Sequence, residues 1–193
     1  DLIVSRGLGD VYKRQYEMWS MDKIKPDTGI LETWSKKYNG PYVLSCKLDG
    51  VSGLYTTENN EKKLYTRGDG KIGQDVSHLI PYLQLPDIQD VVLRGEFIIP
   101  KQKFDEKYKE KFANPRNLVA GIVNQKTKDE KMNDIDFIAY ELIKYPDQIN
   151  GIKPSDQMQM LQDMNVLTVQ NKLVNELSNT MLSDVLQDWR SSY

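Results

Sequence analysis

The strongest constraint on the fold is a series of short segments with alternating apolar residues, separated by turns rich in glycine and asparagine. The segments read YVLSCKLDG (42–50), VSGLYTT (51–57), KLYTRG (63–68) and VVLRGEFIIP (91–100). Alternation with a period of two is typical of β-strands, and short turns of this composition join antiparallel neighbours. The sequence therefore predicts antiparallel sheets in the first half of the chain.

Helical patterns flank these strands. Pro26-Asp27-Thr28 predicts the start of a helix that Asp27 or Thr28 would cap. Further helices are expected at 102–112, 118–125, 155–165 and 179–190, a strand at 135–143, and a strand or extended segment at 166–174. The predicted fold class is α+β, with mainly antiparallel sheets flanked by helices.

Composition narrows the class of protein. The 193 residues carry a formal net charge of −2 and contain one cysteine, Cys46. A single cysteine excludes an internal disulfide framework and a cysteine-rich zinc site, and it favours an intracellular location, in the cytoplasm or nucleus. No apolar run approaches the roughly 20 residues of a membrane helix, so no membrane partner is expected. The near-zero charge neither requires nor excludes nucleic acid.

Residues 1–15 (DLIVSRGLGDVYKRQ) differ from the rest of the chain, because they show no sustained periodicity. The stretch SRGLGDVYKRQ resembles a translated sequencing adaptor, and a disordered N-terminal arm is the alternative. We therefore predict a non-native or disordered tail at 1–15 and a partial domain at 16–193.

Lys47-Leu48-Asp49-Gly50 is the first segment that could carry chemistry. A lysine amine is a good nucleophile only when it is uncharged, and a cleft or a nearby cation favours that form. The end of a strand that faces a ligand would supply such a place, with Asp49 positioning the lysine or binding the substrate. An exposed Lys–Asp pair at a turn is the alternative interpretation.

Three further segments offer groups for phosphate or for a polar ligand. Arg67 begins RGDGKIGQD, which is either a flexible turn or a glycine-rich loop whose N–H groups and guanidinium bind an anion. Glu96 lies in an apolar strand, where it would bind a hydroxyl, an amine or a metal, or form an Arg–Glu pair across strands. Arg116 follows Asn114-Pro115, which would present it to phosphate or simply start a helix.

Tyr140 adds an aromatic ring on the same strand face as Ile138, where it would stack on a flat base or fill the core. Taken in order, KLDGVSGLY, TRGDGKIGQDV, LRGEFIIP, FANPRNLVAGIVN and FIAYELI resemble the adenylation domain of NAD-dependent DNA ligases, which has a nucleotidyltransferase fold. The segment NPRNLVAGIVN resembles the corresponding sequence in ligases of large DNA viruses more than that in bacterial ligases. Val51-Ser52 fits the NAD branch, since the ATP branch carries an arginine at position 52.

The resemblance implies a role for each candidate. Lys47 would be the nucleophile that takes AMP from NAD, with Asp49 and Gly50 completing its motif. Glu96 would bind the ribose, and Tyr140 would stack on the adenine.

The resemblance also implies partners for the later steps. Arg67 would lie near nucleotide and DNA phosphates, and Arg116 would serve the DNA-dependent steps. The enzyme would pass AMP to a 5′-phosphate at a nick in double-stranded DNA and then seal the nick. It would need a divalent cation, Mg²⁺ by expectation, whose ligands the sequence does not identify. A monomer is expected.

The sequence departs from the bacterial members at two positions. Ser45 stands where they carry a glutamate that contacts adenine, and Asn124 stands where they carry a second arginine. The nicotinamide-binding region is expected before about Glu17, and further strands and a nucleic-acid-binding barrel after Tyr193. The chain is therefore expected to be a C-terminally truncated fragment that cannot seal nicks alone. The alternatives are an ATP-dependent DNA or RNA ligase-type nucleotidyltransferase and a catalytically silent nucleotide- or DNA-binding module.

Overall fold

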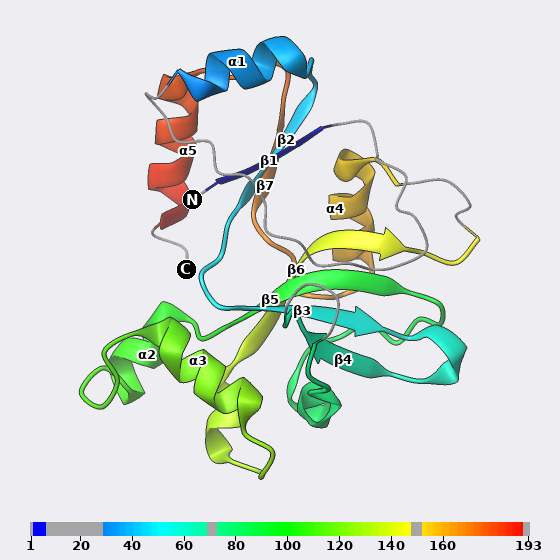
Figure 1. The fold of residues 1–193 in the computed structure, drawn as a ribbon, viewed down its shortest axis with the longest axis vertical. Coiled ribbons are helices and arrows are strands. Elements are labelled where there is room, and N and C mark those ends of the chain that lie inside the picture. The colour runs from blue at the N-terminus through cyan, green and yellow to red at the C-terminus, as the bar shows by residue number, and fades with distance from the viewer. Residues whose placement is uncertain (1, 7–28, 69–72, 148–151, 191–193) are drawn as a thin grey trace.

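The fold was analysed in a computed structural model that describes residues 2–6, 29–68, 73–147 and 152–190 (Figure 1). The strands of this part of the chain are β1 (Leu2–Arg6), β2 (Tyr42–Cys46), β3 (Val51–Thr56), β4 (Lys63–Thr66), β5 (Val92–Ile98), β6 (Asp136–Lys144) and β7 (Asn171–Val174). Its α-helices are α1 (Ile30–Lys37), α2 (Lys101–Lys107), α3 (Pro115–Asn124), α4 (Pro154–Asp163) and α5 (Asn179–Arg190). Short 3₁₀ segments occupy Glu58–Asn60, Ser77–Tyr82 and Glu130–Asp134.

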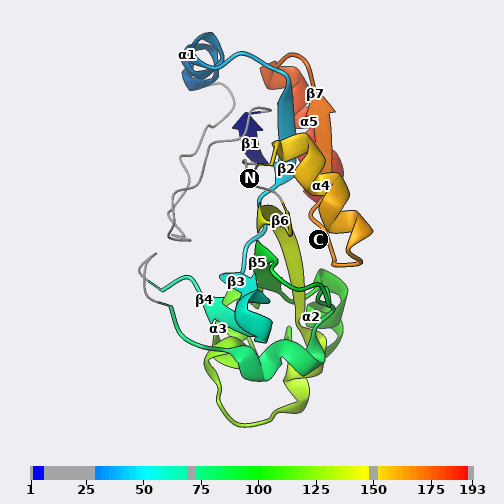
Figure 2. The same ribbon diagram turned by 90° about the vertical axis from the view of Figure 1, so that its right-hand side faces the viewer.

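The strands form two antiparallel sheets. One has the order β1-β2-β7 and the other β4-β3-β5-β6. Figure 2 shows that α1 and α5 lie with the first sheet at one end of the molecule, whereas α2 and α3 lie with the second sheet at the other end. The predicted α+β class with antiparallel sheets and flanking helices is confirmed.

The segment between β2 and β3 carries the chain from one sheet to the other. Residues 42–50 were expected to form one strand, but the strand ends at Cys46 and residues 47–50 have no regular structure. The reason is that the pairing partner changes: β2 pairs with β7, whereas β3 pairs with β5. Lys47 and Asp49 therefore lie on this crossing segment (residues 47–50) and not on a strand face. Figure 1 shows the chain passing from β2 to β3.

β2 itself is buried on both sides. Leu44 packs against Leu31 of α1 and against Leu182 and Val185 of α5. Val43 belongs to the main core on the opposite side, where Ser45 is also buried. β2 therefore joins the two hydrophobic clusters of the protein.

Two glycines make room for an aromatic pair in the core face of the larger sheet. Gly53 of β3 lies opposite Gly95 of β5, and the rings of Phe97 and Phe137 fill the space beside them with centroids 5.1 Å apart. A Cβ atom added at Gly53 would lie 2.5 Å from the Phe97 ring. α3 packs against β3 and β5 and adds four buried residues to the same core, Leu118, Val119, Ile122 and Val123.

The helices begin and end for identifiable local reasons. Gly29, with a φ of 71°, precedes α1, while Asp27 and Thr28 lie outside the described residues. Asn114 caps α3, because its side-chain oxygen accepts from the N–H groups of Arg116 (2.8 Å) and Asn117 (3.4 Å). α2 ends at Lys107, earlier than expected, and α4 packs against β6.

The N-terminal segment contributes one described strand. β1 pairs with the edge of β2 that β7 does not occupy. This pairing does not test whether residues 1–15 are native, so that assignment stays a prediction. None of the described helices combines the length and the apolar character that a bilayer crossing requires.

The glycine packing predicts the outcome of a simple substitution. Gly95→Ala would place a Cβ 2.5 Å from the Phe137 ring and 2.7 Å from the backbone oxygen of Ile138. Overpacking of this kind costs about 1–3 kcal/mol, so we expect Tm to fall by about 2–4 °C for each kcal/mol in a chain of this size.

Gly121→Ala on α3 is the matched control, since nothing lies within 4 Å of its added Cβ. Removing a glycine from a helix without a clash should leave Tm unchanged or raise it slightly. Thermal melts followed by circular dichroism would compare the two, and equal melts would contradict the packing argument.

Candidate functional site

A buried carboxylate lies where the crossing segment enters the larger sheet. Glu96 of β5 is only 8% exposed. Its Oε1 accepts from the backbone N–H of Gly50 at 3.2 Å, and its Oε2 accepts from the hydroxyl of Ser52 at 2.9 Å. Ser52 is the register partner of Glu96 between β3 and β5. The hydroxyl that meets Glu96 here belongs to the protein itself, so the contact with a ligand stays a prediction.

The environment of Glu96 shifts its ionisation. Burial raises the pKa of the carboxyl above its ordinary value of 4.5, and the charge of Asp49 adds to the rise. The hydrogen bonds from Ser52 and Gly50, and the positive charge of Arg116, act in the opposite direction. Ionised Glu96 is therefore less stable in this position than in water.

An Arg–Glu pair across strands does occur, but it joins different residues. Nη1 of Arg94 on β5 lies 3.2 Å from Oε2 of Glu141 on β6, and both side chains are buried. Nε of Arg94 has no acceptor among the described residues. A buried donor without a partner is costly, so this face of the sheet retains a hydrogen-bond donor that a ligand or water could satisfy.

A β-bulge places Tyr140 beside this pair. Gly95 pairs with Ala139 and Arg94 pairs with Glu141, so β6 carries one extra residue, Tyr140, at this point. Bulges of this kind turn a side chain away from its regular direction. Burial and the nearby charge of Glu96 raise the pKa of Tyr140 to about 12, and Ser52 acts to lower it. The phenol is therefore neutral and in electrostatic contact with Glu96.

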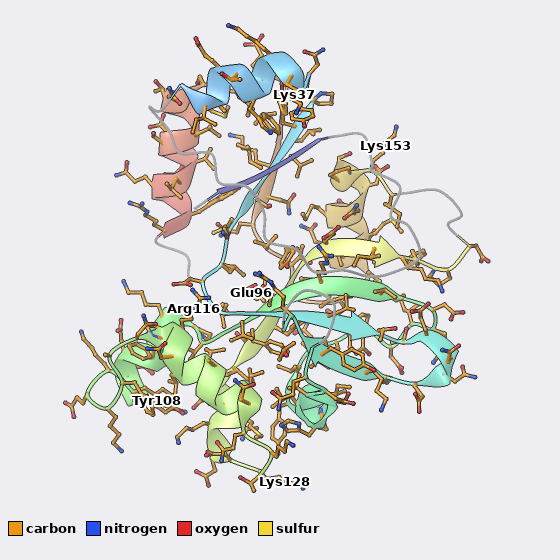
Figure 3. All side chains as sticks on the ribbon, viewed as in Figure 1. Lys37, Glu96, Tyr108, Arg116, Lys128 and Lys153 are labelled. Carbon is orange, nitrogen blue, oxygen red and sulfur yellow. The ribbon has the colours of Figure 1, made fainter. Side chains whose placement is uncertain are left out.

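A positively charged helix end faces the crossing segment. Arg116 lies in the first turn of α3, two residues after the Asn114 cap, and its Nη1 is 3.5 Å from Oδ1 of Asp49. Both side chains are well exposed, so this ion pair adds little to stability. Figure 3 shows Arg116 and Glu96 near each other at the junction of the two sheets. Asn114 therefore both caps the helix and helps to present the arginine.

The main chain of Arg67 contacts β3 beside Glu96. Its backbone N–H donates to the carbonyl oxygen of Ser52 at 3.0 Å. Gly73, at the other end of the loop that Arg67 begins, lies so close to Thr66 that an added Cβ would be 1.7 Å from the Thr66 carbonyl oxygen. Residues 69–72 of the predicted glycine-rich loop lie outside the described residues.

Lys47 lies on the crossing segment, two residues before Asp49 and three before Gly50, and its side chain is half-buried. Gly50 is the last residue of this segment. Its backbone lies so close to β5 that an added Cβ would be 1.9 Å from the Phe97 carbonyl oxygen. The short distance along the chain ties the Lys47 backbone to the carboxylate of Glu96. The described residues contain no group of three or more His, Cys, Asp or Glu side chains that could hold a metal ion.

Comparison with known proteins shows to which family the chain belongs. The family model described as "NAD-dependent DNA ligase adenylation domain" matches residues 10–192. The chain belongs to this family. The resemblance seen in the sequence is confirmed, and the NAD-dependent ligase family implies NAD as the substrate that supplies the adenylate.

The relatives of this adenylation domain include viral and bacterial ligases. A DNA ligase of Acanthamoeba polyphaga mimivirus is 40% identical over 190 residues, which cover 93% of this chain and 29% of the viral protein. The protein 205R of Invertebrate iridescent virus 6, provisionally named a DNA ligase, is 37% identical over 94% of this chain and 31% of its own length. A DNA ligase of Wolinella succinogenes is 35% identical over 126 residues. The chain thus spans less than a third of the viral relatives that it matches.

The structure brings most of the predicted site residues together, though their roles stay predictions. Asp49, Gly50, Glu96, Arg116 and Tyr140 are linked by contacts or by electrostatic influence. The two departures from bacterial members lie elsewhere in the fold: buried Ser45 is on β2 and exposed Asn124 ends α3.

Sequence reasoning missed three residues of this face. Ser52 was noted only as a marker of the NAD branch, and the Arg94–Glu141 pair was not foreseen. The available signal was a set of polar side chains inside apolar strands. That signal becomes specific only when the strand register is known.

The raised pKa of Glu96 predicts a pH-dependent effect of Glu96→Gln. Glutamine keeps both contacts if its amide oxygen accepts from Gly50 and its amide nitrogen donates to the Ser52 hydroxyl. Because the pKa is raised on folding, ionisation of Glu96 lowers the stability of the wild type as pH rises above about 4.5. The variant lacks this penalty, so its stability advantage should be small in acid and grow towards neutral pH.

Denaturant unfolding of both proteins from about pH 4 to about pH 8 would measure this difference. Other titrating groups are shared by the two proteins and cancel in the comparison. A difference that does not change with pH would contradict the raised pKa.

Proposed function

We propose that this chain is the part of a DNA ligase that forms a covalent lysyl-AMP from NAD, with Lys47 as the nucleophile. The observation that carries the proposal is the crossing segment, since it joins Lys47 directly to the residues that hold Glu96. The family match supports the reaction class and the cofactor. The sequence motifs support the assignment of Lys47.

The proposed step is a displacement at the α-phosphorus of NAD. The uncharged amine of Lys47 forms an N–P bond, the bond from phosphorus to the bridging oxygen of the pyrophosphate breaks, and nicotinamide mononucleotide leaves with that oxygen. The proton of the amine passes to solvent. Positive charge from Arg116 beside the segment would offset negative charge on the phosphate.

The remaining residues would bind the nucleotide. We propose that Glu96 accepts hydrogen bonds from the ribose hydroxyls and that Tyr140 stacks on the adenine. Asp49 and Gly50 would orient the segment that bears Lys47, as their contacts with Arg116 and Glu96 suggest. Arg67 and Arg116 would contact phosphates, of the nucleotide and of DNA.

A divalent cation, Mg²⁺ by proposal, would neutralise charge on the phosphate oxygens. Magnesium commonly keeps several waters and binds through substrate phosphates with only one or two carboxylates. This mode suits the described residues, which offer no acidic cluster. The exposed carboxylate of Asp49 is the group that we propose could contact the ion or its waters.

The activity of the whole protein is also a proposal, because the relatives are much longer than this chain. The relatives are named DNA ligases, and on that basis we propose that the complete protein passes AMP to a 5′-phosphate of nicked duplex DNA and seals the nick. It would work as a monomer inside the cell.

The assignment of Lys47 predicts the loss of covalent labelling. The full-length protein, incubated with adenylate-labelled NAD, should carry label that survives a denaturing gel. Lys47→Ala should reduce this label to background with an unchanged circular dichroism spectrum, since no other amine occupies the position of the nucleophile. Lys128→Ala is the control, because Figure 3 shows this exposed lysine far from Glu96.

The same assay separates the competing functions. Label from ATP and not from NAD would favour an ATP-dependent DNA or RNA ligase-type enzyme. A wild-type protein that binds nucleotide but never becomes labelled would be a silent binding module. Labelling that persists in Lys47→Ala would contradict the assignment of the nucleophile.

A further inference from the structure

Among the described residues, the hydroxyl of Ser52 is the side-chain group that donates to the Glu96 carboxylate. It donates to Oε2 at 2.9 Å, while the other oxygen receives the backbone N–H of Gly50 at 3.2 Å. Two donors, one on each oxygen, determine both the side-chain conformation and the plane of the carboxylate. Only one of the two donors can be removed by substitution without changing the backbone.

Because Glu96 is buried, its carboxylate depends on the hydrogen bond from the Ser52 hydroxyl. Because Glu96 is 8% exposed, water has little access to replace a lost hydrogen bond. A buried carboxylate that loses a donor either becomes protonated or turns towards another partner. Arg116 and the Arg94–Glu141 pair offer such alternatives nearby. The hydrogen bond from Ser52 therefore holds the Glu96 carboxylate in one orientation, and without it the carboxylate could adopt several.

Ser52 also acts on the aromatic ring of the site. It lowers the pKa of Tyr140, whereas burial and Glu96 raise it. The register places Ser52 and Ile138 opposite Glu96, and alternation along β6 puts Tyr140 on the same face as Ile138. The hydroxyl thus lies within reach of both the acid and the phenol, which would contact the ribose and the base of one nucleotide.

We propose that Ser52 is a positioning residue that orients Glu96 for the ribose hydroxyls of the adenylate. This inference rests on the proposed function, which assigns the ribose contact to Glu96. Ser52 itself need not touch the nucleotide. Its contribution is to keep one carboxylate oxygen from turning towards Arg116 or Arg94, so that the acid discriminates ribose from a sugar without hydroxyls.

The first test uses binding of two nucleotides to the wild-type chain and to Ser52→Ala. AMP carries both ribose hydroxyls and 2′,3′-dideoxy-AMP carries neither, so the ratio of their dissociation constants reports the ribose contact. Loss of one hydrogen bond to a charged group should reduce the preference for AMP by about tenfold. Ser52→Thr keeps the hydroxyl and should keep the preference, and Ser183→Ala, an exposed serine of α5, is the surface control.

A double substitution separates positioning from a structural role. On a Glu96→Gln background, Ser52→Ala should change the AMP preference no further, because Ser52 acts through the carboxylate. An unchanged preference in Ser52→Ala alone, or an equal loss on both backgrounds, would overturn the proposal.

The second test needs no nucleotide. A carboxyl-carbon NMR titration should show a higher pKa for Glu96 in Ser52→Ala than in the wild type, because the serine stabilises the ionised form. The other charged or titratable groups around Glu96 are present in both proteins and cancel: Asp49, Arg94, Arg116, Tyr140 and Glu141. An unshifted pKa would overturn the role of Ser52 while leaving the ligase function intact. Failure of the wild-type chain to bind AMP would instead contradict the proposed function, and the titration would then decide the role of Ser52.

Discussion

The arrangement of the site depends on the hydrogen bonds that the buried carboxylate of Glu96 accepts from Gly50 and Ser52. A charged group with so little exposure persists only when donors meet its oxygens, and both donors come from the residues that lead into β3. The crossing segment must therefore end where the N–H of Gly50 points at Glu96. This requirement determines where Lys47 and Asp49 lie, because they precede Gly50 by only three residues and one residue.

The two faces of the larger sheet meet opposite physical demands. On one face, Gly53 and Gly95 leave space that the Phe97 and Phe137 rings fill, and this face supplies stability. On the other face, the strands bury Arg94, Glu96 and Glu141, which apolar side chains could replace without loss of stability. Folding alone therefore does not require the charges on this face. Alternation along β5 allows both demands to be met by one strand.

The local elements were largely predictable because their patterns are local. The strand in VVLRGEFIIP, the helix after Asn114 and the strand through Tyr140 were expected and are observed. The strand from Tyr42 to Gly50 was predicted too long, since nothing in its alternation indicates that the chain changes sheets after Cys46. The alternation also does not show that both sides of β2 are covered, with Leu44 in one hydrophobic cluster and Val43 in the other. The pairing of Arg94 with Glu141 follows from the bulge in β6, whose position depends on the register with β5.

The sequence by itself determined which chemical groups are present and in what order: a lysine before an Asp-Gly pair, an acid in an apolar strand, arginines beside turns, and a ring. Those properties are carried by side chains and by short spacings, so the family could be recognised from them. Only the tertiary structure decided which groups meet. Ser52 and Glu96 are 44 residues apart and touch because β3 and β5 pair in one register, and a shift of one residue would turn either side chain to the other face.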